Sequence, residues 1–478
     1  MLIENGTVLT AGVTPAVLPN HSVLIENGYI TRIAPAKRLK SSASKRIDAS
    51  RKVVAPGFIN AHTHLYSTFA RGLTKTRPAG NFVEVLQNLW WRLDSALTTE
   101  DCYYSALVPL LESIRHGTTT LIDHHASPNA VRGSLTAIEK AVRQTGLRAC
   151  LCYELSDRDG ARISREGLEE NVAFIRRCQR SEVRDERSEV ELEEPAVQGS
   201  KFKVRGSGFA GHPRPSPLAP RPSHLSALFG LHAAFTLKDA TLEKAAALGH
   251  ELGTGFHIHV AEALSDQQYS RQKHRLRVVE RLNKFGILGP RSIAAHCVHV
   301  NRRELDILSQ TQTAVVHNPQ SNLNNAVGIA NVVSMARRNV LVGLGTDAMT
   351  TNMLEELRVA LWAQHLRAQN PSAGFAEVVT ALFFNNPRIA GRVFNLPLGE
   401  LREGCVGDVV LIDYDPPTPL DGGNSFGHMV FGISQAAVDT TIVGGRVLME
   451  NRRLTLDLDE PRINARAREL AAKLWKRL

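Results

Sequence analysis

Long apolar runs, paired cysteines and a basic leader segment are all missing from this chain of 478 residues. No apolar stretch reaches the roughly 18 residues that a membrane-spanning helix needs, so we expect no membrane contact. The N-terminal residues lack the basic and apolar segments of a secretory signal, which favours a cytoplasmic location. The cysteines are few and scattered, which argues against a disulfide framework and predicts buried, reduced thiols. They are Cys102, Cys150, Cys152, Cys178, Cys297 and Cys405.

Aromatic residues make up only 6% of the chain, and no basic stretch is interleaved with them. The formal net charge of +10 by itself is compatible with nucleic-acid binding. However, the basic residues are spread along the chain, often beside an acidic residue. We therefore predict a solvated surface and no nucleic-acid partner.

Alternating apolar strands and helices follow one another from about Pro56 to Asn395, and this pattern predicts a parallel sheet. The strand-like runs are VVAPGFINAH, TTTLIDHH, RACLCYEL, SALFGLHA, GTGFHIHVA, SIAAHCVHV, TAVVHNP and VLVGLGTD. The helical runs are Glu100–His116, Leu135–Thr145, Arg162–Arg177, Leu237–Glu251, Lys273–Phe285 and Arg302–Gln310. This arrangement fits an α/β fold of the (β/α)₈ TIM-barrel type over residues 56–395.

The two ends of the chain are rich in short β-type runs. LIENG occurs at Leu2–Gly6 and at Leu24–Gly28, and Asn-Gly is a strong hairpin signal. Similar runs return at Asp408–Asp415 and Val438–Leu454. We expect residues 1–55 and 396–455 to form one small antiparallel domain, a composite β-sandwich built from both termini.

Two further segments lie outside these patterns. Ser181–Ser223 contains a charged repeat and a proline-rich stretch, which predicts a disordered or extended insertion after the third barrel helix, on the face away from the site. A proline-rich segment can also bind a partner in the polyproline II conformation. Residues 456–478 have apolar residues at helical spacing and predict a C-terminal helix packed on the body.

Polar residues at the ends of four strand-like runs form a candidate metal site. His62 and His64 end the first run, and His259 with Glu262, His296 and Asp347 end later runs. The carboxyl ends of parallel strands meet at one rim of a barrel. Three imidazoles and a carboxylate suit a first-row divalent ion with a position left open for water, which implies hydrolysis.

The segments PGFINAHTH, HIHVAE, AAHCVH, VVHNPQSN and GLGTDA resemble the motifs of the amidohydrolase superfamily. Within it, they are similar to the branch of guanine deaminase, the methylthioadenosine and homocysteine-type adenosine deaminases, and the s-triazine hydrolases. Longer stretches, such as RVVERLNKFGILGPRSIAAHCVHVN, resemble aminohydrolases of the SsnA type. The resemblance covers nearly the whole chain except the Ser181–Ser223 insertion.

The resemblance implies that one divalent metal ion, zinc or alternatively iron, is bound by four residues of this chain. These are His62, His64, His259 and Asp347. His259 is preferred to His257 because the family places its ligand three residues before the glutamate. A second metal ion is not expected, because the fourth strand ends FGLHA without a lysine or acid to bridge two ions.

The same resemblance gives roles to catalytic residues. Glu262 is expected to shuttle protons, His296 to polarise the developing oxyanion or to contact the metal water, and Asp347 to orient that water. The candidates for substrate contacts are His232, Glu84, Asn322 and Trp90. His124 and His125 also follow a strand, and no role is assigned to them.

These features predict a metal-dependent aminohydrolase that deaminates a small heterocyclic substrate. Opening of a cyclic amide or displacement of ring chloride on the same site remains an alternative. A catalytically inactive barrel that serves as a binding module is a more distant one. A homodimer is expected only as the commonest assembly.

Overall fold

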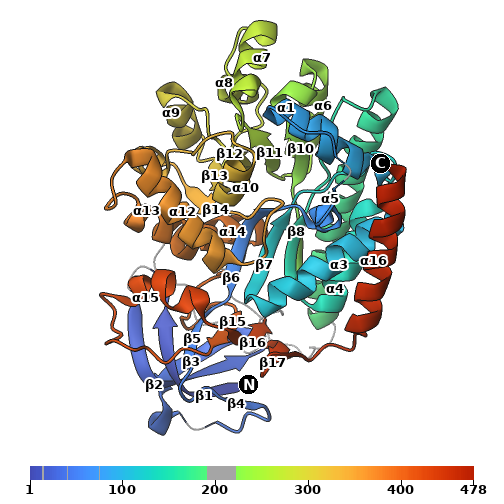
Figure 1. Cartoon of the computed structure of the whole chain (residues 1–478). Coiled ribbons are helices and arrows are strands. Elements are labelled where there is room, and N and C mark those ends of the chain that lie inside the picture. The colour runs from blue at the N-terminus through green and yellow to red at the C-terminus, as the bar shows by residue number, and fades with distance from the viewer. Residues whose placement is uncertain (13–14, 40, 75, 191–221) are drawn as a thin grey trace, which may run out of the picture.

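The protein is described by a computed structural model over residues 1–12, 15–39, 41–74, 76–190 and 222–478. Its main body is a barrel of parallel strands with helices around it (Figure 1). The barrel strands confirm the eight runs expected from the sequence. They are β6 (Phe58–Thr63), β7 (Thr118–Asp123), β8 (Arg148–Leu151), β9 (Leu225–Ala227) with β10 (Phe229–Ala233), β11 (Phe256–Val260), β12 (Ile293–His296), β13 (Ala314–His317) and β14 (Val342–Leu344).

Hydrogen bonding divides these strands into two arcs, β6-β7-β8-β9 and β10-β11-β12-β13-β14. Only Leu228 separates β9 from β10, so the two occupy one position in the barrel. A bridge between Thr63 and Asp347 joins the other ends of the arcs. There the backbone N–H of Asp347 donates to His62 O at 3.0 Å. The first and last barrel strands are therefore linked directly beside two candidate ligands.

Helices lie outside the barrel strands and account for most of the expected helical runs. They are α3 (Thr99–Arg115), α4 (Ser134–Thr145), α5 (Ala161–Val190), α6 (Asp239–Glu251), α8 (Val278–Lys284) and α9 (Arg302–Gln310). The single helix expected over Lys273–Phe285 was wrong at its start. There the structure has the end of a separate helix, α7 (Leu264–His274), and α8 begins only after it. Arg275 caps α7 in the left-handed region with φ of 59°.

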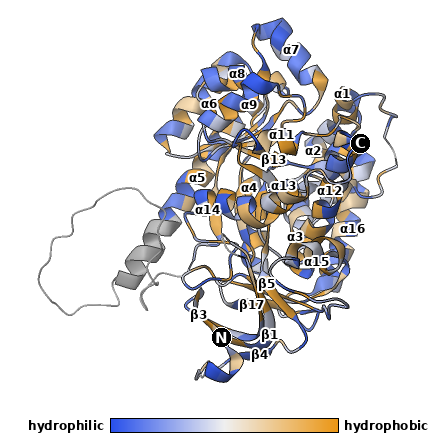
Figure 2. Ribbon diagram, turned by 90° about the vertical axis from the view of Figure 1, so that its left-hand side faces the viewer, coloured by the Kyte–Doolittle hydropathy of each residue, from blue (hydrophilic) through white to orange (hydrophobic). Residues whose placement is uncertain are grey.

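Further helices complete the body, and no run was expected for them. They are α1 (Phe82–Val85), α2 (Trp91–Ala96), α10 (Pro319–Asn324), α11 (Val332–Ala336), α12 (Met353–Ala368), α13 (Phe375–Thr380), α14 (Asn386–Phe394) and α15 (Ser425–Phe431). Figure 2 shows apolar residues on the strands and on inner helix faces, whereas α7 and α8 at the rim are largely hydrophilic.

Strands from both ends of the chain form a nine-stranded sheet below the barrel (Figure 1). They are β1 (Leu2–Thr10), β2 (Ala16–Glu26), β3 (Tyr29–Pro35), β4 (Arg46–Asp48), β5 (Val53–Pro56), β15 (Val409–Ile412), β16 (Val438–Val443), β17 (Arg446–Glu450) and β18 (Arg453–Leu454). Strand β5 pairs with β15 and so joins the two ends. The sheet is not wholly antiparallel as expected, since β1 pairs in parallel with β4 and β5.

The two LIENG segments have different conformations. Asn27 and Gly28 turn between β2 and β3 with φ of 50° and 85°, as a two-residue hairpin requires. Asn5 and Gly6 instead lie inside β1 at a shift of register, where the φ of Asn5 is 62°. The same letters therefore make a turn at one place and a bulge at the other.

The segment expected to be extended begins as helix, because α5 continues through Ser181 to Val190. Residues 191–221 of that segment lie outside the described residues, so the rest of the expectation remains a prediction. Where the description resumes, Pro222 lies against the β2–β3 turn: a Cβ added to Gly28 would lie 2.7 Å from Pro222 Cδ. The chain re-enters the barrel on the side of the nine-stranded sheet.

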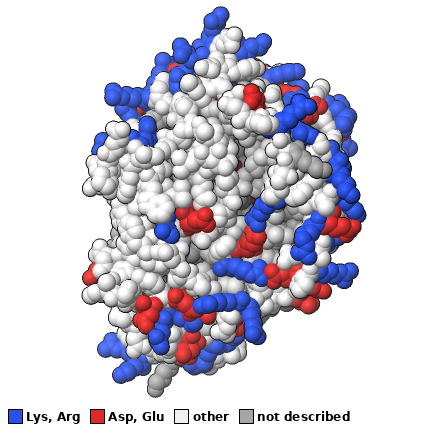
Figure 3. Space-filling view, in the orientation of Figure 1, with Lys and Arg blue, Asp and Glu red and all other residues white. Residues whose placement is uncertain are grey.

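The C-terminal helix α16 (Glu460–Arg477) packs on the barrel body as expected. It buries Ile463, Ala467, Leu470 and Leu474, and Trp475 Nε1 donates to Phe69 O at 2.7 Å. Among the described residues, no helix combines the length and apolar character needed to cross a membrane. On the face shown in Figure 3, basic side chains lie among acidic ones.

Candidate active site

The candidate metal ligands come from distant segments and meet at the carboxyl ends of the barrel strands. His62 lies in β6 and His64 directly after it, His259 lies in β11, and Asp347 follows β14. His62, His64 and Asp347 are buried. The structure thus brings together the four side chains that the sequence selects, at the end of the barrel where sites of this fold lie.

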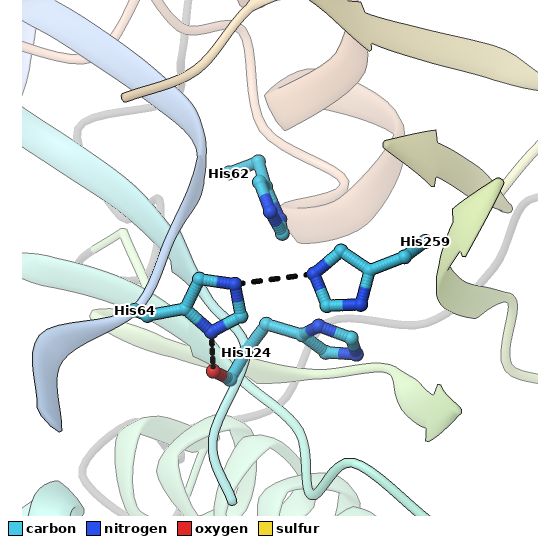
Figure 4. Close-up of side chains that lie close together, drawn as sticks. All are labelled: His62, His64, His124 and His259. Carbon is cyan, nitrogen blue, oxygen red and sulfur yellow. Dashed lines mark hydrogen bonds between the residues drawn. The ribbon is translucent and has the colours of Figure 1, made fainter. Parts of the chain in front are cut away.

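Ring nitrogens and one carboxylate converge within these four residues. Asp347 Oδ1 lies 2.9 Å from His64 Nε2 and 3.4 Å from His62 Nε2. His64 Nε2 and His259 Nε2 face each other at 3.1 Å (Figure 4). Ligand atoms of His62, His259, His296 and Asp347 all lie within 4.8 Å of one another. Such a donor set of nitrogens with one carboxylate suits zinc or iron.

The other ring nitrogen of each histidine already has a partner. His64 Nδ1 lies 2.6 Å from the backbone oxygen of His124, and His259 Nδ1 lies 2.8 Å from that of His232. His62 Nδ1 lies 2.8 Å from His257 Nε2. The two backbone oxygens can only accept, so they fix Nδ1 of His64 and His259 as the protonated nitrogen and leave Nε2 as the ligand atom. His62 has the same arrangement when its Nδ1 donates to His257. The structure places His257 behind His62, as the preference for His259 implied.

Two further observations fit a cation at this point. His62 Nε2 is buried and has no hydrogen-bond partner among the described residues. Burial lowers the pKa of His64, yet Asp347 and Glu154 raise it well above its usual value. The local field therefore favours positive charge beside the Nε2 atoms. Burial also opposes ionisation of Asp347, but the adjacent imidazoles of His62 and His64 hold its pKa well below the usual range.

Glu262 and His296 stand beside the ligands. His296 Nε2 lies 3.5 Å from Glu262 Oε2 and 3.9 Å from Asp347 Oδ2. Burial, followed by the charges of Asp347 and Asp266, raises the pKa of Glu262 well above its usual value. Burial lowers the pKa of His296 to about 4, so its imidazole is neutral at pH 7. Glu262 therefore has the raised pKa that is expected of a group that carries protons in catalysis.

The backbone at this rim adopts a conformation that side chains rarely take. The φ angles of His296, Asp347 and Ala261 are 70°, 51° and 46°. Each such residue costs about 1–3 kcal/mol, and such residues cluster at functional sites. The packing of the surrounding barrel therefore keeps these rim residues in a conformation that their backbones would not favour alone.

A pocket opens over the ligands, and two of the four proposed substrate contacts line it. Its wall includes Trp90 and His232. Glu84 is not part of this lining; it caps α1 by accepting from Gly80 N at 2.7 Å. Asn322 is not part of it either, and its Oδ1 faces His296 Nδ1 at 2.8 Å. Asn322 therefore contacts a catalytic candidate from behind.

Several residues of the pocket lining were not predicted from the sequence: Tyr66, Trp91, Asp94, Glu154 and Arg158. Glu154 follows β8, where the run RACLCYEL places an acid at a strand end, so its position carried a signal. Asp94 and Arg158 form a buried ion pair. This ion pair joins α2 to the segment after β8, and no spacing of residues in the sequence predicts it.

Comparison with known proteins places the chain among hydrolases. The model of the amidohydrolase family matches residues 53–448. A 5'-deoxyadenosine deaminase of Methanobrevibacter smithii is 30% identical over 459 residues, which cover 95% of this chain and 93% of that protein. A 5-methylthioadenosine/S-adenosylhomocysteine deaminase of Carboxydothermus hydrogenoformans is 31% identical over 480 residues, which cover 99% and 98%.

Solved structures share the fold at lower identity. An adenosine deaminase of Xanthomonas campestris with bound zinc has a TM-score of 0.78 at 22% identity, covering 99% of this chain and 98% of that one. The atrazine chlorohydrolase of Arthrobacter aurescens in complex with zinc has a TM-score of 0.76 at 21%, covering 98% and 99%. The guanine deaminase of E. coli has a TM-score of 0.71 at 19%, covering 94% and 98%.

Proposed function

The chain belongs to the amidohydrolase family and is a metal-dependent hydrolase of the deaminase type, and we propose that it removes an amino group from a purine-like heterocycle using one zinc ion. His62, His64, His259 and Asp347 hold the ion in this proposal. Glu262 and His296 serve the reaction, and the pocket wall that includes His232 and Trp90 receives the ring.

A divalent ion in this site supplies Lewis acidity and lowers the pKa of a bound water towards about 7. The carboxylate of Asp347 can accept a proton beside the ligands. Glu262, which is protonated more readily than an ordinary glutamate, can carry a proton to a ring nitrogen and then to the departing amino group. His296 keeps one ring nitrogen against Asn322 and turns the other towards Glu262 and Asp347, where it can accept a hydrogen bond from the protonated Glu262 or from a water held beside the ligands.

One observation carries the proposal: three histidines whose Nδ1 atoms are engaged elsewhere direct their Nε2 atoms, together with one carboxylate, to a point beside a protonatable glutamate. The three imidazoles and the carboxylate of Asp347 hold the cation, and Glu262 supplies the proton transfer that loss of ammonia requires. A binding module has no need of a glutamate with a raised pKa at that position.

The relatives bear names of enzymes that act on 5'-deoxyadenosine, methylthioadenosine and S-adenosylhomocysteine. Their similarity over nearly the whole chain supports an aminated purine or a purine nucleoside as the first substrates to test. A cytoplasmic location, a homodimer and the absence of a nucleic-acid partner remain predictions of the sequence.

The test combines elemental analysis with ammonia release from a panel of aminated purines, pterins and triazines. We expect about one tightly held zinc ion per chain and ammonia from at least one purine. One ion per chain without ammonia from any member would redirect the proposal to ring opening or chloride displacement. Absence of bound metal after loading would refute it.

A further inference from the structure

Glu154 is a buried acid in the pocket wall that the proposed chemistry does not use. It follows β8, and its backbone N–H donates to His125 O at 2.7 Å, which fixes the chain there. The residue is 5% exposed and lines the pocket together with His64 and Glu262. A carboxylate buried to this extent is costly unless hydrogen-bond donors surround it.

The protein itself meets that need only in part, since the further imidazole nitrogen near this carboxylate, His124 Nδ1, lies 3.5 Å from Glu154 Oε1. Glu154 Oε1 has no hydrogen-bond partner among the described residues. Its nearest polar neighbour, His64 Nδ1, lies 3.1 Å away, but the single N–H there faces the backbone oxygen of His124 at 2.6 Å. Arg158, a cation in the same lining, is engaged by Asp94 and Asp159.

His232 does not supply the missing donor either. Its Nδ1 lies 2.8 Å from Thr236 Oγ1, whose own hydrogen is donated to Ala233 O at 3.0 Å. The hydroxyl must therefore accept, and His232 Nδ1 must carry the proton. With the proton on Nδ1, the other ring nitrogen of His232, Nε2, keeps its lone pair and is an acceptor. This acceptor lies 3.8 Å from Glu154 Oε2.

A second metal ion is a poor occupant for this place. Glu154, His232 and His259 lie near enough to one another to form a three-ligand group. His259, however, uses Nδ1 on the backbone oxygen of His232 and turns Nε2 towards the proposed ion. Only two ligands then remain, which is fewer than a metal site of this kind needs.

Resting on the proposed function, we propose that Glu154 and His232 form an acceptor wall that selects heterocycles with a ring N–H beside the amino-bearing carbon. The substrate class is then the lactam type, as in guanine, rather than rings such as adenine, in which the nitrogens of the six-membered ring only accept. Because Glu154 lies next to the proposed ligand His64, the N–H group that donates to Glu154 belongs to the reacting ring and not to a distant sugar.

Two pairs of free bases isolate this difference. Guanine and 2-aminopurine carry the same amino group on C2, but only guanine has N1–H. Isoguanine and adenine carry the same amino group on C6, and the lactam form of isoguanine adds the N–H. Dissociation constants are measured by calorimetry on zinc-loaded protein, and kcat/KM is measured wherever ammonia is released. Binding needs no turnover, so a failure of the proposed deamination is seen separately.

We expect the wild-type protein to bind the N–H member of a pair at least about tenfold more tightly. Glu154→Gln is expected to reduce that preference by about tenfold while zinc content stays at one ion per chain. Glu169→Gln, a change on the exposed face of α5 that breaks only the ion pair with Arg132, serves as the matched control.

Equal affinity within both pairs would overturn the proposal. The proposal would also be overturned if Glu154→Gln lost zinc and bound all the ligands more weakly by the same factor, because Glu154 would then act only on His64. A second equivalent of zinc that is lost in Glu154→Gln would assign the carboxylate to a metal instead. Tighter binding of nucleosides, without any preference within the pairs, would assign it to a sugar hydroxyl.

Discussion

The contact between His62 and His257 tests how the metal site is oriented. His257 is fully buried, and its Nε2 lies 2.8 Å from Nδ1 of His62. Its own Nδ1 lies 3.7 Å from Cys152 Sγ, which in turn donates to Asp123 O at 3.4 Å. The chain of contacts runs in one direction and keeps the lone pair of His62 on Nε2.

His257→Ala removes the acceptor and leaves the Nδ1–H of His62 buried without a partner. Loss of such an outer contact typically lowers metal affinity about 10- to 100-fold. That change corresponds to about 1.4–2.7 kcal/mol of binding free energy. His257→Gln keeps an acceptor near the position of Nε2 and should recover much of the affinity.

The assay is competition for zinc between the protein and a chelator, with thermal unfolding of each apoprotein as the second measurement. His317→Ala is the matched control, because His317 is equally buried at the end of β13 and its ring has no hydrogen-bond partner among the described residues. Both alanine variants should lose stability, but only His257→Ala should lose zinc affinity. Equal zinc affinities in the two variants would refute the orienting role.

The remaining predictions concern catalysis, thiols and the segment after α5. Glu262→Gln should retain zinc by elemental analysis while kcat falls at least about 100-fold, because the amide cannot carry the proton; full activity on a confirmed substrate would contradict the assignment. All six cysteines are buried, and burial raises the pKa of Cys102 to about 12. A thiol reagent should therefore react slowly with the native protein, and it should label all six thiols once the protein is unfolded. Rapid labelling of the native protein would contradict that burial. Replacing residues 191–221 with a short Gly-Ser linker should leave kcat/KM within about twofold, because Pro222 re-enters beside Gly28 of the small sheet. A collapse in kcat/KM with unchanged thermal unfolding would place that segment in catalysis.

The sequence was informative where one residue pattern has one structural outcome. Apolar runs that end in histidine or aspartate gave β6, β11, β12 and β14 with their polar side chains at the rim. Asn27-Gly28 gave the hairpin turn, because both residues accept positive φ. Those elements depend on local patterning, which the sequence displays directly.

Other features depend on contacts that no local pattern reveals. Asn5-Gly6 repeats the hairpin letters but lies within β1, which pairs with β2 on one side and with β5 on the other. Gly6 is packed so closely that an added Cβ would lie 2.4 Å from Val54. Glu84 was expected at the substrate, yet a nearby backbone N–H holds its carboxylate on α1. The break between α7 and α8 occurs at Arg275, a residue type that seldom ends a helix in this conformation.

The hydrogen bonds from the Nδ1 atoms of the proposed ligands go partly to backbone oxygens and leave nearby side chains for other roles. The backbone oxygens of His124 and His232 orient His64 and His259, and a main-chain oxygen keeps that role whatever side chain its residue carries. The ring of His232 is then available for the pocket wall, where it stands next to Glu154. At the end of β10, the backbone oxygen of His232 therefore orients His259, whereas the ring of the same residue lies in the pocket wall. A barrel built in this way can change the ring it accepts at β8 and β10 while its metal ligands keep their positions.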